Sequence, residues 1–446
     1  MFDPDLHLFV NEEEISLKQR MYRMIHPVRR EEFDPVLSPN GEDEGTAIGY
    51  ASVVRDEENG VYRMWYMCHA DSKLRGAVSE DGREWERRGG MVVNEEQFAL
   101  DNMALVELGP DVDEWFEGAK LVGYGYGKGS GKDGSTSHGL HMLRSMDGER
   151  VEMRVPGILP GVGDRSSLVF DELTGEYSLI SRPSGRTPGF RKGELVRVRT
   201  GNLWKSRDLV DWENLGVVVK YDEQDRHDVE IYGIQPFRYG AGWLGLVEVY
   251  FRGRERLETQ LAWSEDGMKW ERVEPRDPVL RMGGEGAWDS HWVVSTNNPP
   301  FLVDDRLMIF YSGAGTKHGS KNRHKRGIGL ASLRRDGWVS LEAGREEGGV
   351  VTAPLPLEKP MQLELNANAY SGYVSVEVMA AEEGKESQAL EGYEGEASMA
   401  EGIDAVRHPV HWGEKRVIEP VECGRCYLRF AMKQASFFSY RWSAVE

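Results

Sequence analysis

The chain has 446 residues, with 75 acidic residues against 55 basic ones and a formal net charge of −20 at pH 7. A chain this acidic lacks the basic face that nucleic acids and anionic membrane surfaces need. We therefore exclude both as partners. The length leaves room for two domains.

The first 30 residues contain short runs with strand character, Leu6–Val10 and Met21–His26 among them. We expect them to complete the last sheet of a ring or to lie along its side. The start, MFDPD, lacks the basic and apolar regions of a signal peptide, which favours a cytoplasmic location, although a trimmed chain would look the same. No apolar stretch approaches the ~20 residues that a membrane span requires.

One phrase then recurs at intervals of roughly 60 to 70 residues. Residues 79–86 read SEDGREWE and residues 264–271 read SEDGMKWE, with looser copies beginning at Ser145, Ser206 and Ser332. An Asp-Gly pair supplies the left-handed residue of a tight turn, and Ser and Asp side chains bond the N–H groups of that turn. The Trp that follows is expected to pack one repeat against the next. We therefore interpret these positions as structural.

Each turn follows runs that are rich in aromatic and branched residues and bracketed by Gly, Asn or Asp, which indicates strands. Channel-lining strands are expected at 50–55, 103–107, 166–170, 234–238 and 299–303. Second strands are expected at 61–68, 119–126, 176–182, 243–250 and 306–312. No stretch has sustained helical periodicity, so the fold class is all-β. A repeat of this length holds about four short strands, and its copies predict a five-bladed β-propeller.

A domain boundary is expected near residue 350, before the linker Pro354-Leu355-Pro356. We expect residues 1–350 to form the propeller, with residues 1–30 closing or flanking its ring. Residues 355–446 are expected to form a C-terminal β-sandwich. Its strands are predicted at 361–365, 372–379, 406–412 and 426–432.

The three cysteines fit a reducing compartment. Cys423 and Cys426 have a spacing seen in metal sites, with His408 and His411 a short distance upstream. Since no second pair of Cys or His accompanies them at metal-site spacing, we predict neither a metal nor a cofactor. The basic segment 317–326 is interpreted as a solvated rim loop, the alternative being a contact with a phosphate or an anionic sugar.

A propeller carries its chemistry at the mouth of the central channel. In every repeat an acid lies about 13 to 19 residues before the second strand; these acids are Glu44, Asp101, Asp164, Glu230 and Asp289. If they converge, their repulsion drives their pKa values apart, so that one stays protonated while another stays charged. Cleavage of a glycosidic bond needs such a pair. The alternative is that surface loops of an acidic protein simply carry acids.

Polar and aromatic neighbours of these acids fit a sugar site. Asn102 adjoins Asp101, Tyr232 follows Glu230, and Arg182 ends the second strand of the third repeat. The residues expected to bind an oligosaccharide or glycoside substrate are Asp101, Asn102, Arg182, Tyr232, Asp289 and His291. The oligomeric state is left open.

A five-bladed propeller followed by a β-sandwich resembles the group of glycoside hydrolase families 32, 43 and 68 and, more distantly, family 130. The likeness is strongest in the Ser-x-Asp-Gly-x-x-Trp turns and in residues 53–66. The resemblance implies a nucleophile or base in blade one, an Asp in blade three and a Glu general acid in blade four. These roles fall on Glu44, Asp164 and Glu230, while Glu42 and Asp43 stay open as alternatives to Glu44.

Family 32 motifs are absent from the expected places. Arg276-Asp277-Pro278 follows a turn and should connect two blades, and Glu422-Cys423 lies in the C-terminal domain. The chain is therefore expected to be a divergent member of the group, and the fructose-specific meaning of those motifs does not transfer.

The prediction is a glycoside hydrolase, an exo-acting glycosidase on a terminal furanosyl-type sugar. One alternative is a glycoside phosphorylase, in which phosphate replaces water and Arg182, His291 and residues 317–326 face the mouth. Another is a non-catalytic carbohydrate-binding propeller. Retention or inversion depends on the carboxylate separation, about 5 Å against 6.5–9.5 Å, and is left open.

Overall fold

The computed structural model describes residues 1–41, 43–93, 99–128, 139–159, 162–183, 187–191, 194–320, 326–382 and 388–445. Regular structure in these segments consists of strands and two short 3-10 turns, η1 (Glu114–Phe116) and η2 (Gly395–Ser398). The all-β class expected from the sequence is confirmed. Across the same segments no helix is long and apolar enough to cross a membrane.

The first two repeats form separate meanders, which are antiparallel except where β9 pairs with β13. The first is a four-stranded sheet in the order β5-β6-β7-β8 and the second a five-stranded sheet in the order β10-β11-β12-β13-β9. Their bounds are β5 (Ile48–Asp56), β6 (Val61–Cys68), β7 (Lys73–Ser79), β8 (Glu86–Arg88), β9 (Val92–Val93), β10 (Ala99–Glu107), β11 (Leu121–Lys128), β12 (Gly139–Ser145) and β13 (Val151–Leu159). Each meander begins with its innermost strand, as predicted.

The third repeat forms the four-stranded sheet β14-β15-β18-β19, and the hairpin β16-β17 is inserted between its second and third strands. The bounds are β14 (Val162–Asp171), β15 (Glu176–Pro183), β16 (Thr187–Arg191), β17 (Glu194–Val198), β18 (Gly201–Ser206) and β19 (Glu213–Val219).

The last two repeats share one ten-stranded sheet. The bounds are β4 (Arg29–Arg30), β20 (Val229–Tyr239), β21 (Gly242–Phe251), β22 (Arg256–Ser264), β23 (Glu271–Arg272), β24 (Pro278–Leu280), β25 (Trp292–Ser295), β26 (Phe301–Val303), β27 (Arg306–Ala314) and β28 (Arg326–Arg334). Its two halves meet through the single residue pair Leu257 and Trp292, so they act as two meanders. The N-terminal strand β4 completes the last meander by pairing with β28.

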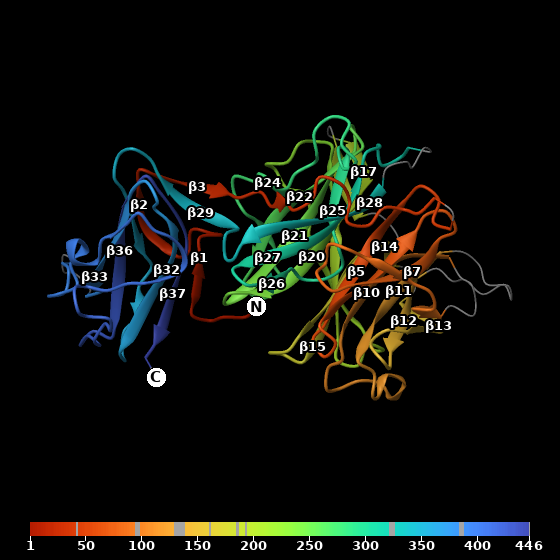
Figure 1. The fold of residues 1–446 in the computed structure, drawn as a ribbon, viewed down its shortest axis with the longest axis horizontal. Coiled ribbons are helices and arrows are strands. Elements are labelled where there is room, and N and C mark those ends of the chain that lie inside the picture. The colour runs from red at the N-terminus through yellow and green to blue at the C-terminus, as the bar shows by residue number, and fades with distance from the viewer. Residues whose placement is uncertain are drawn as a thin grey trace.

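The inner strands surround a common axis. β10 contacts both β5 and β14, and β14 contacts β20. The last meander returns to β5, where the Asn297 N–H donates to the Ala51 carbonyl over 2.8 Å. These sheets make up the right-hand unit in Figure 1.

The repeated turns are held as the sequence predicts. In the first copy the Ser79 hydroxyl accepts from the Gly82 N–H over 2.9 Å, while Asp81 accepts from the two following N–H groups. Gly82 has a φ of 75°, in the left-handed region that glycine tolerates. The Trp85 ring meets Phe310 of the last meander edge-on at 5.7 Å. The turn therefore joins neighbouring sheets.

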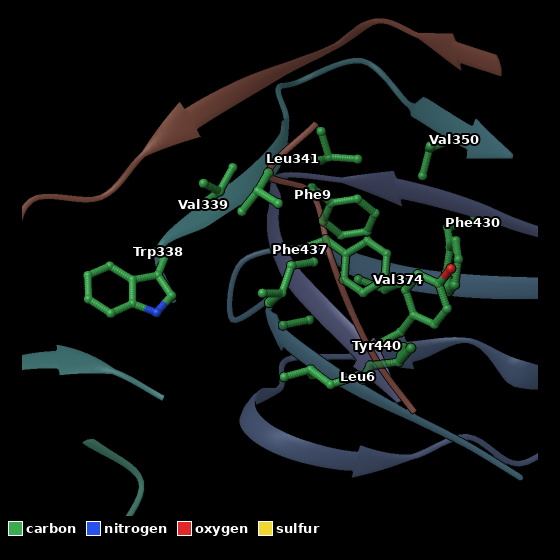
Figure 2. Packing of buried hydrophobic residues seen from close by; sticks show 14 of the residues in the cluster. Leu6, Phe9, Trp338, Val339, Leu341, Val350, Val374, Phe430, Phe437 and Tyr440 are labelled. Carbon is green, nitrogen blue, oxygen red and sulfur yellow. The ribbon is translucent and has the colours of Figure 1, made fainter. Parts of the chain in front are cut away.

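The C-terminal unit consists of two six-stranded sheets, β3-β29-β37-β32-β35 with β1, and β2-β30-β36-β33-β34 with β31. The bounds are β1 (Leu6–Leu8), β2 (Ile15–Gln19), β3 (Met21–Ile25), β29 (Val339–Ala343), β30 (Gly348–Thr352), β31 (Leu355–Pro356), β32 (Met361–Asn368), β33 (Tyr373–Ala380), β34 (Ala400–Glu401), β35 (Asp404–Pro409), β36 (Arg425–Lys433) and β37 (Ala435–Ala444). Apolar side chains from both sheets, Phe430 and Phe437 among them, meet in one core (Figure 2).

This pairing differs from the expected division near residue 350. The strands β1–β3 and β29–β30 belong to the C-terminal sheets rather than to the ring. The physical reason is burial, since Phe9 packs on Phe437 at a ring distance of 4.9 Å and Leu341 is fully buried beside them. Trp338, fully buried, continues this core towards Phe237 of β20.

Candidate functional site

Register shifts occur at the same end of the inner strands of the first four meanders. They fall at residues 50–51 of β5, at Asp101 of β10, at residues 163–165 of β14 and at Tyr232 of β20. A bulge inserts an extra residue into one strand and redirects its side chain, and bulges are frequent beside active sites. The four strands therefore turn irregular positions towards one mouth of the ring.

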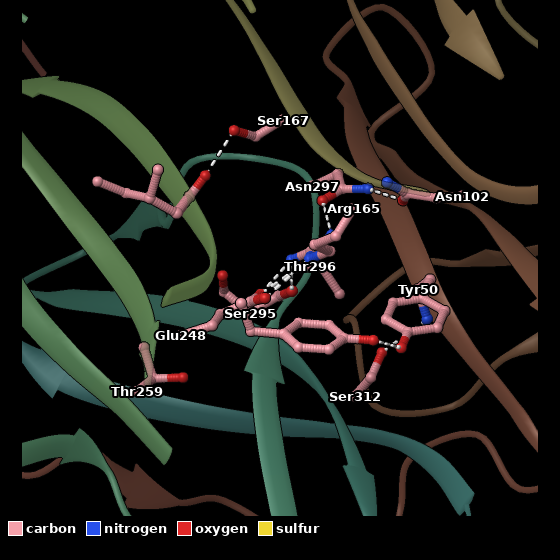
Figure 3. Close-up of polar contacts among 12 residues, drawn as sticks. Tyr50, Asn102, Arg165, Ser167, Glu248, Thr259, Ser295, Thr296, Asn297 and Ser312 are labelled. Atoms are coloured by element: carbon pink, nitrogen blue, oxygen red, sulfur yellow. Dashed lines mark hydrogen bonds and ion pairs between the residues drawn. The ribbon is translucent and has the colours of Figure 1, made fainter. Parts of the chain in front are cut away.

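The floor of this mouth is a buried polar network (Figure 3). The Arg165 Nε donates to both carboxylate oxygens of Glu248, at 3.0 and 2.9 Å, and a terminal nitrogen donates to Asn297. Asn297 in turn donates to the side chain of Asn102. Burial alone would lower the pKa of Arg165, but the charge and hydrogen bonds of Glu248 raise it. The network links four strands or loops and stabilises the centre of the ring.

Tyr232 is the meeting point above that floor. Its hydroxyl lies 3.1 Å from the Tyr50 hydroxyl and 3.0 Å from the His318 Nε2. The guanidinium of Arg182 stands 4.7 Å from the centre of its ring, and that of Arg199 stands 5.7 Å away. Side chains from the first, third, fourth and last meanders thus converge on one phenol.

Two of the predicted carboxylates are linked to the aromatic ring of Tyr232 through their arginine partners. Glu230 accepts from Arg199 over 2.6 Å and from Arg252 over 3.3 Å, and its side chain is fully buried. Asp164 forms an ion pair with Arg182, and 31% of its side chain is exposed. The structure therefore brings Asp164, Arg182, Glu230 and Tyr232 together, with one carboxylate enclosed and the other open.

Asp101 joins the same region through Tyr50. Burial, the neighbouring Tyr232 hydroxyl and the charge of Asp101 together hold the pKa of Tyr50 well above its usual value. The Tyr50 phenol thus keeps its proton at neutral pH and is able to donate a hydrogen bond. Tyr50 itself has a φ of 50°, a left-handed conformation that is strained for an aromatic residue.

Glu44 lies away from these contacts. Its buried carboxylate accepts from the Tyr66 hydroxyl, from the Asn40 N–H at 3.0 Å, and from the Arg87 Nε at 3.0 Å. Burial by itself raises the pKa of Glu44, but the hydrogen bonds of Arg87 and Tyr66 outweigh it and lower the pKa. A carboxylate with this many donors is suited to holding the loop on β6 and β8. Of its alternatives, Glu42 lies outside the described residues and Asp43 is exposed.

The predicted residues of the last repeat lie in two further places. Asp289 is buried against Arg30, whose Nε donates over 2.8 Å, and against the Tyr311 hydroxyl. His291 has its Nδ1 3.1 Å from the Ser290 hydroxyl. Burial and nearby positive charges lower the pKa of His291. Neither contacts Tyr232 in any described interaction.

Several residues of the cluster escaped the sequence reading. They are Tyr50, Arg165, Arg199, Glu248, Arg252 and Asn297. His318 lies in the segment 317–326, which the phosphorylase alternative placed at the mouth. An arginine or tyrosine one position from a predicted inner-strand start, as with Arg165 beside Asp164, was a usable signal. Arg199 and Arg252 follow the strands β17 and β21, and no local pattern points them at Glu230. Of the basic segment 317–326, residues 321–325 lie outside the described part of the chain.

Within the described segments no cluster of three or more His, Cys, Asp or Glu side chains is arranged to hold a metal ion. Cys426 is buried in β36 whereas Cys423 is exposed. The mouth cluster therefore offers carboxylates, guanidinium groups and phenols, which bind hydroxyl-rich or anionic ligands and transfer protons.

No family model matches the sequence, and no curated protein matches it. A solved structure described as a glycoside hydrolase is similar over 68% of this chain and 92% of its own, with 13% identity and a TM-score of 0.51. An N-acetylgalactosamine deacetylase from F. plautii, in complex with blood group B trisaccharide, is similar over 69% and 95%, with 15% identity and a TM-score of 0.51. A β-1,2-mannobiose phosphorylase from Listeria innocua is similar over 69% and 96%, with 14% identity and a TM-score of 0.48.

At identities this low, the structural similarity shows the fold alone, and the activity has to be argued from the site. The resemblance to propeller glycoside hydrolases that the sequence carries is confirmed at the level of the fold, and the low identity fits a divergent member.

Proposed function

We propose that this protein cleaves glycosidic bonds at the mouth of the ring. One observation carries the proposal: the register shifts at one end of four inner strands gather Tyr50, Asp101, Asp164 and Tyr232, and Glu230 joins them through Arg199. Paired carboxylates at a mouth lined with phenols and arginines have the composition that glycoside cleavage requires.

The two carboxylates differ in a way that supports separate roles. Arginine donates hydrogen bonds and never accepts them, so both oxygens of Glu230 serve as acceptors for Arg199 and Arg252. We therefore assign to Glu230 the fixed negative charge beside the reacting sugar carbon, in place of the general-acid role that the resemblance implied. Asp164, which pairs with Arg182 and has 31% of its side chain exposed, is assigned the proton transfer. Asp101 replaces Glu44 as the further carboxylate of the site.

The finer points of substrate and architecture are part of the same proposal. A mouth closed below by the Arg165–Glu248 pair admits a chain end more readily than the middle of a polymer, which supports exo-action. A terminal furanosyl-type sugar is the proposed substrate. The meanders count as five blades of a propeller, completed by β4. The strands β1–β3 and β29–β37 form a C-terminal sandwich.

The test is hydrolysis of a panel of nitrophenyl furanosides and pyranosides, measured with and without phosphate. Release of nitrophenol without phosphate, abolished in both Asp164→Asn and Glu230→Gln, is the expected result. Turnover that survives both substitutions would overturn the assignment of the two carboxylates. Absence of turnover with every glycoside, with sugars still bound, would indicate a carbohydrate-binding propeller.

A glycoside phosphorylase is the second candidate, and a specific observation favours it. Arg182, Arg199 and His318 surround the ring of Tyr232, and Arg252 adds a partly exposed guanidinium. Guanidinium groups bind phosphate through paired hydrogen bonds. Nitrophenol release that depends on added phosphate would establish this activity in place of hydrolysis.

A further inference from the structure

One side of the mouth is built by three segments that hydrogen-bond to one another. The His291 N–H donates to the Ala314 carbonyl over 2.9 Å, and the Leu257 N–H donates to the His291 carbonyl over 3.2 Å. The His318 N–H donates to the Glu255 carbonyl over 3.1 Å. The turn between β21 and β22, the residues before β25 and the residues after β27 therefore form one surface.

This surface carries positive charge without acidic partners. Arg254 and Lys317 are exposed, and Arg256 is half-buried at the start of β22. None of these three side chains forms an ion pair with another residue in the described part of the chain. The acid between the two arginines, Glu255, is turned onto the neighbouring loop, since a Cβ at Gly319 would lie 2.4 Å from its carboxylate.

Two of these cations act on one imidazole. Burial, together with the charges of Arg256 and Lys317, lowers the pKa of His291. Its Nδ1 lies 3.1 Å from the Ser290 hydroxyl, and its Nε2 has no hydrogen-bond partner among the described residues. Arg256, Lys317 and His291 therefore lie close together although they come from three segments, and we call them the basic wall.

His318 connects the basic wall to the mouth. Its backbone belongs to the same surface, and its Nε2 lies 3.0 Å from the Tyr232 hydroxyl. Its ring lies 5.1 Å from that of Tyr250. Lys317 is its neighbour in the chain. A sugar unit bound at Tyr232 therefore has the basic wall to one side.

The carboxylates of the mouth do not oppose a negatively charged ligand there. Asp164 pairs with Arg182, and Glu230 pairs with Arg199 and Arg252. These charges are offset locally, so the unpaired cations of the basic wall leave this side of the mouth positive, on a chain whose net charge is −20. A group of like charges beside a cleft attracts ligands of the opposite sign.

We propose that the basic wall binds an oxyanion, namely a carboxylate of the substrate, and that the protein acts on glycosides with a uronic acid unit at or next to the terminal sugar. This inference rests on the proposed function for the reaction. Guanidinium and ammonium groups bind carboxylates through charge-assisted hydrogen bonds.

Free phosphate has the same chemistry but fits the position of the wall less well. A phosphate that attacks the sugar must lie beside Asp164 and Glu230. Within the described residues, no side chain of the basic wall hydrogen-bonds or pairs with either carboxylate. The wall is therefore placed for a charge carried elsewhere on the substrate.

The test is calorimetric titration of the unmodified protein with two pairs of sugars, D-galacturonate with D-galactose and D-glucuronate with D-glucose. The members of a pair differ only in whether C6 is a carboxylate or an alcohol. We expect at least one uronate to bind about tenfold more tightly than its neutral counterpart, as one charge-assisted hydrogen bond provides. Arg256→Gln and Lys317→Gln should each reduce this ratio roughly threefold to tenfold, and Arg256→Lys, which keeps the charge, should preserve most of it.

Matched controls are available on the C-terminal unit. Arg416 and Lys359 are exposed and form no ion pair with a described residue, so their change to Gln should leave the ratio as it is. Equal binding of both members of each pair, or a ratio that survives Arg256→Gln and Lys317→Gln, would overturn the inference. Inorganic phosphate is titrated alongside, and its binding through these two residues without a preference for uronates would overturn the carboxylate in favour of free phosphate.

Failure of the proposed function gives a different result. Turnover of neutral nitrophenyl glycosides without a preference for uronates would retain the cleavage and overturn only the basic wall. A preference for uronates that Arg256→Gln and Lys317→Gln reduce, without turnover of any glycoside, would support the basic wall and overturn the cleavage.

Discussion

The repeated turns and the mouth of the ring arise from the same sequence repeat but have opposite characters. In the turns, Asp81, Asp208 and Asp266 accept from the same two following N–H groups, and the Trp indole bonds the same backbone position in each copy. At the mouth, the register shifts carry tyrosine in two strands, at Tyr50 and Tyr232, and aspartate in the other two, at Asp101 and Asp164. Identical bonds repeat where the ring needs support, whereas the residues vary where the strands meet a ligand.

Of the substitutions in the two regions, we expect the one at Glu230 to have the largest effect on activity. Glu230→Gln keeps the size of the side chain but removes the charge that faces Arg199 and Arg252. We expect kcat/KM for the responsive nitrophenyl glycoside to fall by about 10²- to 10³-fold, the range for loss of one group that stabilises charge in the transition state. Steady-state kinetics measure it, with circular dichroism as the check that the sheets persist. A change below threefold would contradict the role.

A substitution in the floor of the mouth should lower the free energy of unfolding. Glu248→Gln leaves the Arg165 charge buried without its carboxylate partner, which costs about 3–5 kcal/mol in comparable buried pairs. Urea unfolding measures the loss. The double change Arg165→Met with Glu248→Met removes both charges and should cost less. An equal or larger loss in the double variant would show that the pair does more than neutralise itself.

Glu44 tests the contrast between the two regions. A role in catalysis at the mouth and a role in supporting the fold predict different effects of its substitution. Glu44→Gln removes charge-assisted bonds from Arg87 and Tyr66, and we expect a loss of about 2 kcal/mol in the free energy of unfolding. We expect kcat to stay within threefold of the unmodified value. A loss of kcat comparable to that of Glu230→Gln, without a loss of stability, would return Glu44 to the active site.

Loss of the contacts in a single turn should lower the free energy of unfolding by less. Asp81→Ala removes the acceptor for the N–H groups of Arg83 and Glu84, at 2.8 and 3.0 Å, on a largely exposed loop. We expect a loss of about 1 kcal/mol in unfolding free energy with unchanged kinetics. Asp266→Ala, in the matching turn, should behave alike in urea unfolding. Unequal losses would mean that the two turns are not equivalent.

The smallest effect is a dependence on pH. The Glu84 N–H, with help from the Arg83 N–H and the Ser79 hydroxyl, lowers the pKa of Asp81. An unfolded Asp titrates near pH 3.9, so the stabilisation is present above about pH 4 and is lost as the pH falls through the lower folded value. The difference in unfolding free energy between the unmodified protein and Asp81→Asn should therefore shrink between pH 6 and pH 3. A difference that grows would reverse the sign.

The local patterns of the ring could be predicted from the sequence. The run 61–68 matches β6 residue for residue, because a continuous run of aromatic and other apolar residues between turn residues marks a strand that is buried on both faces. The pairing of the strands in the C-terminal sheets could not be predicted from the sequence. β1 pairs with β37 from the far end of the chain, and nothing local in Leu6–Leu8 specifies so distant a partner. The last inner strand was found only in part, since the predicted run 299–303 contains β26 but misses β25, which precedes β26 and pairs with the same strand β27.

The site was predictable only in part for a related reason. Acids before strand starts are visible in the sequence, and Asp101, Asp164 and Glu230 were found that way. Their partners Arg199 and Arg252 come from neighbouring loops, and only the closed ring brings them to Glu230. Glu44 has the same sequence signal, but Arg87 and Tyr66 hold it elsewhere.

One measurement tests the central contrast directly: kcat/KM for a responsive nitrophenyl glycoside in Asp164→Asn and in Asp266→Asn, the same chemical change at the mouth and in a turn. We expect a fall of at least about a hundredfold for Asp164→Asn and less than a twofold change for Asp266→Asn. Comparable activity in both variants would contradict the claim that the irregular ends of the inner strands carry the chemistry.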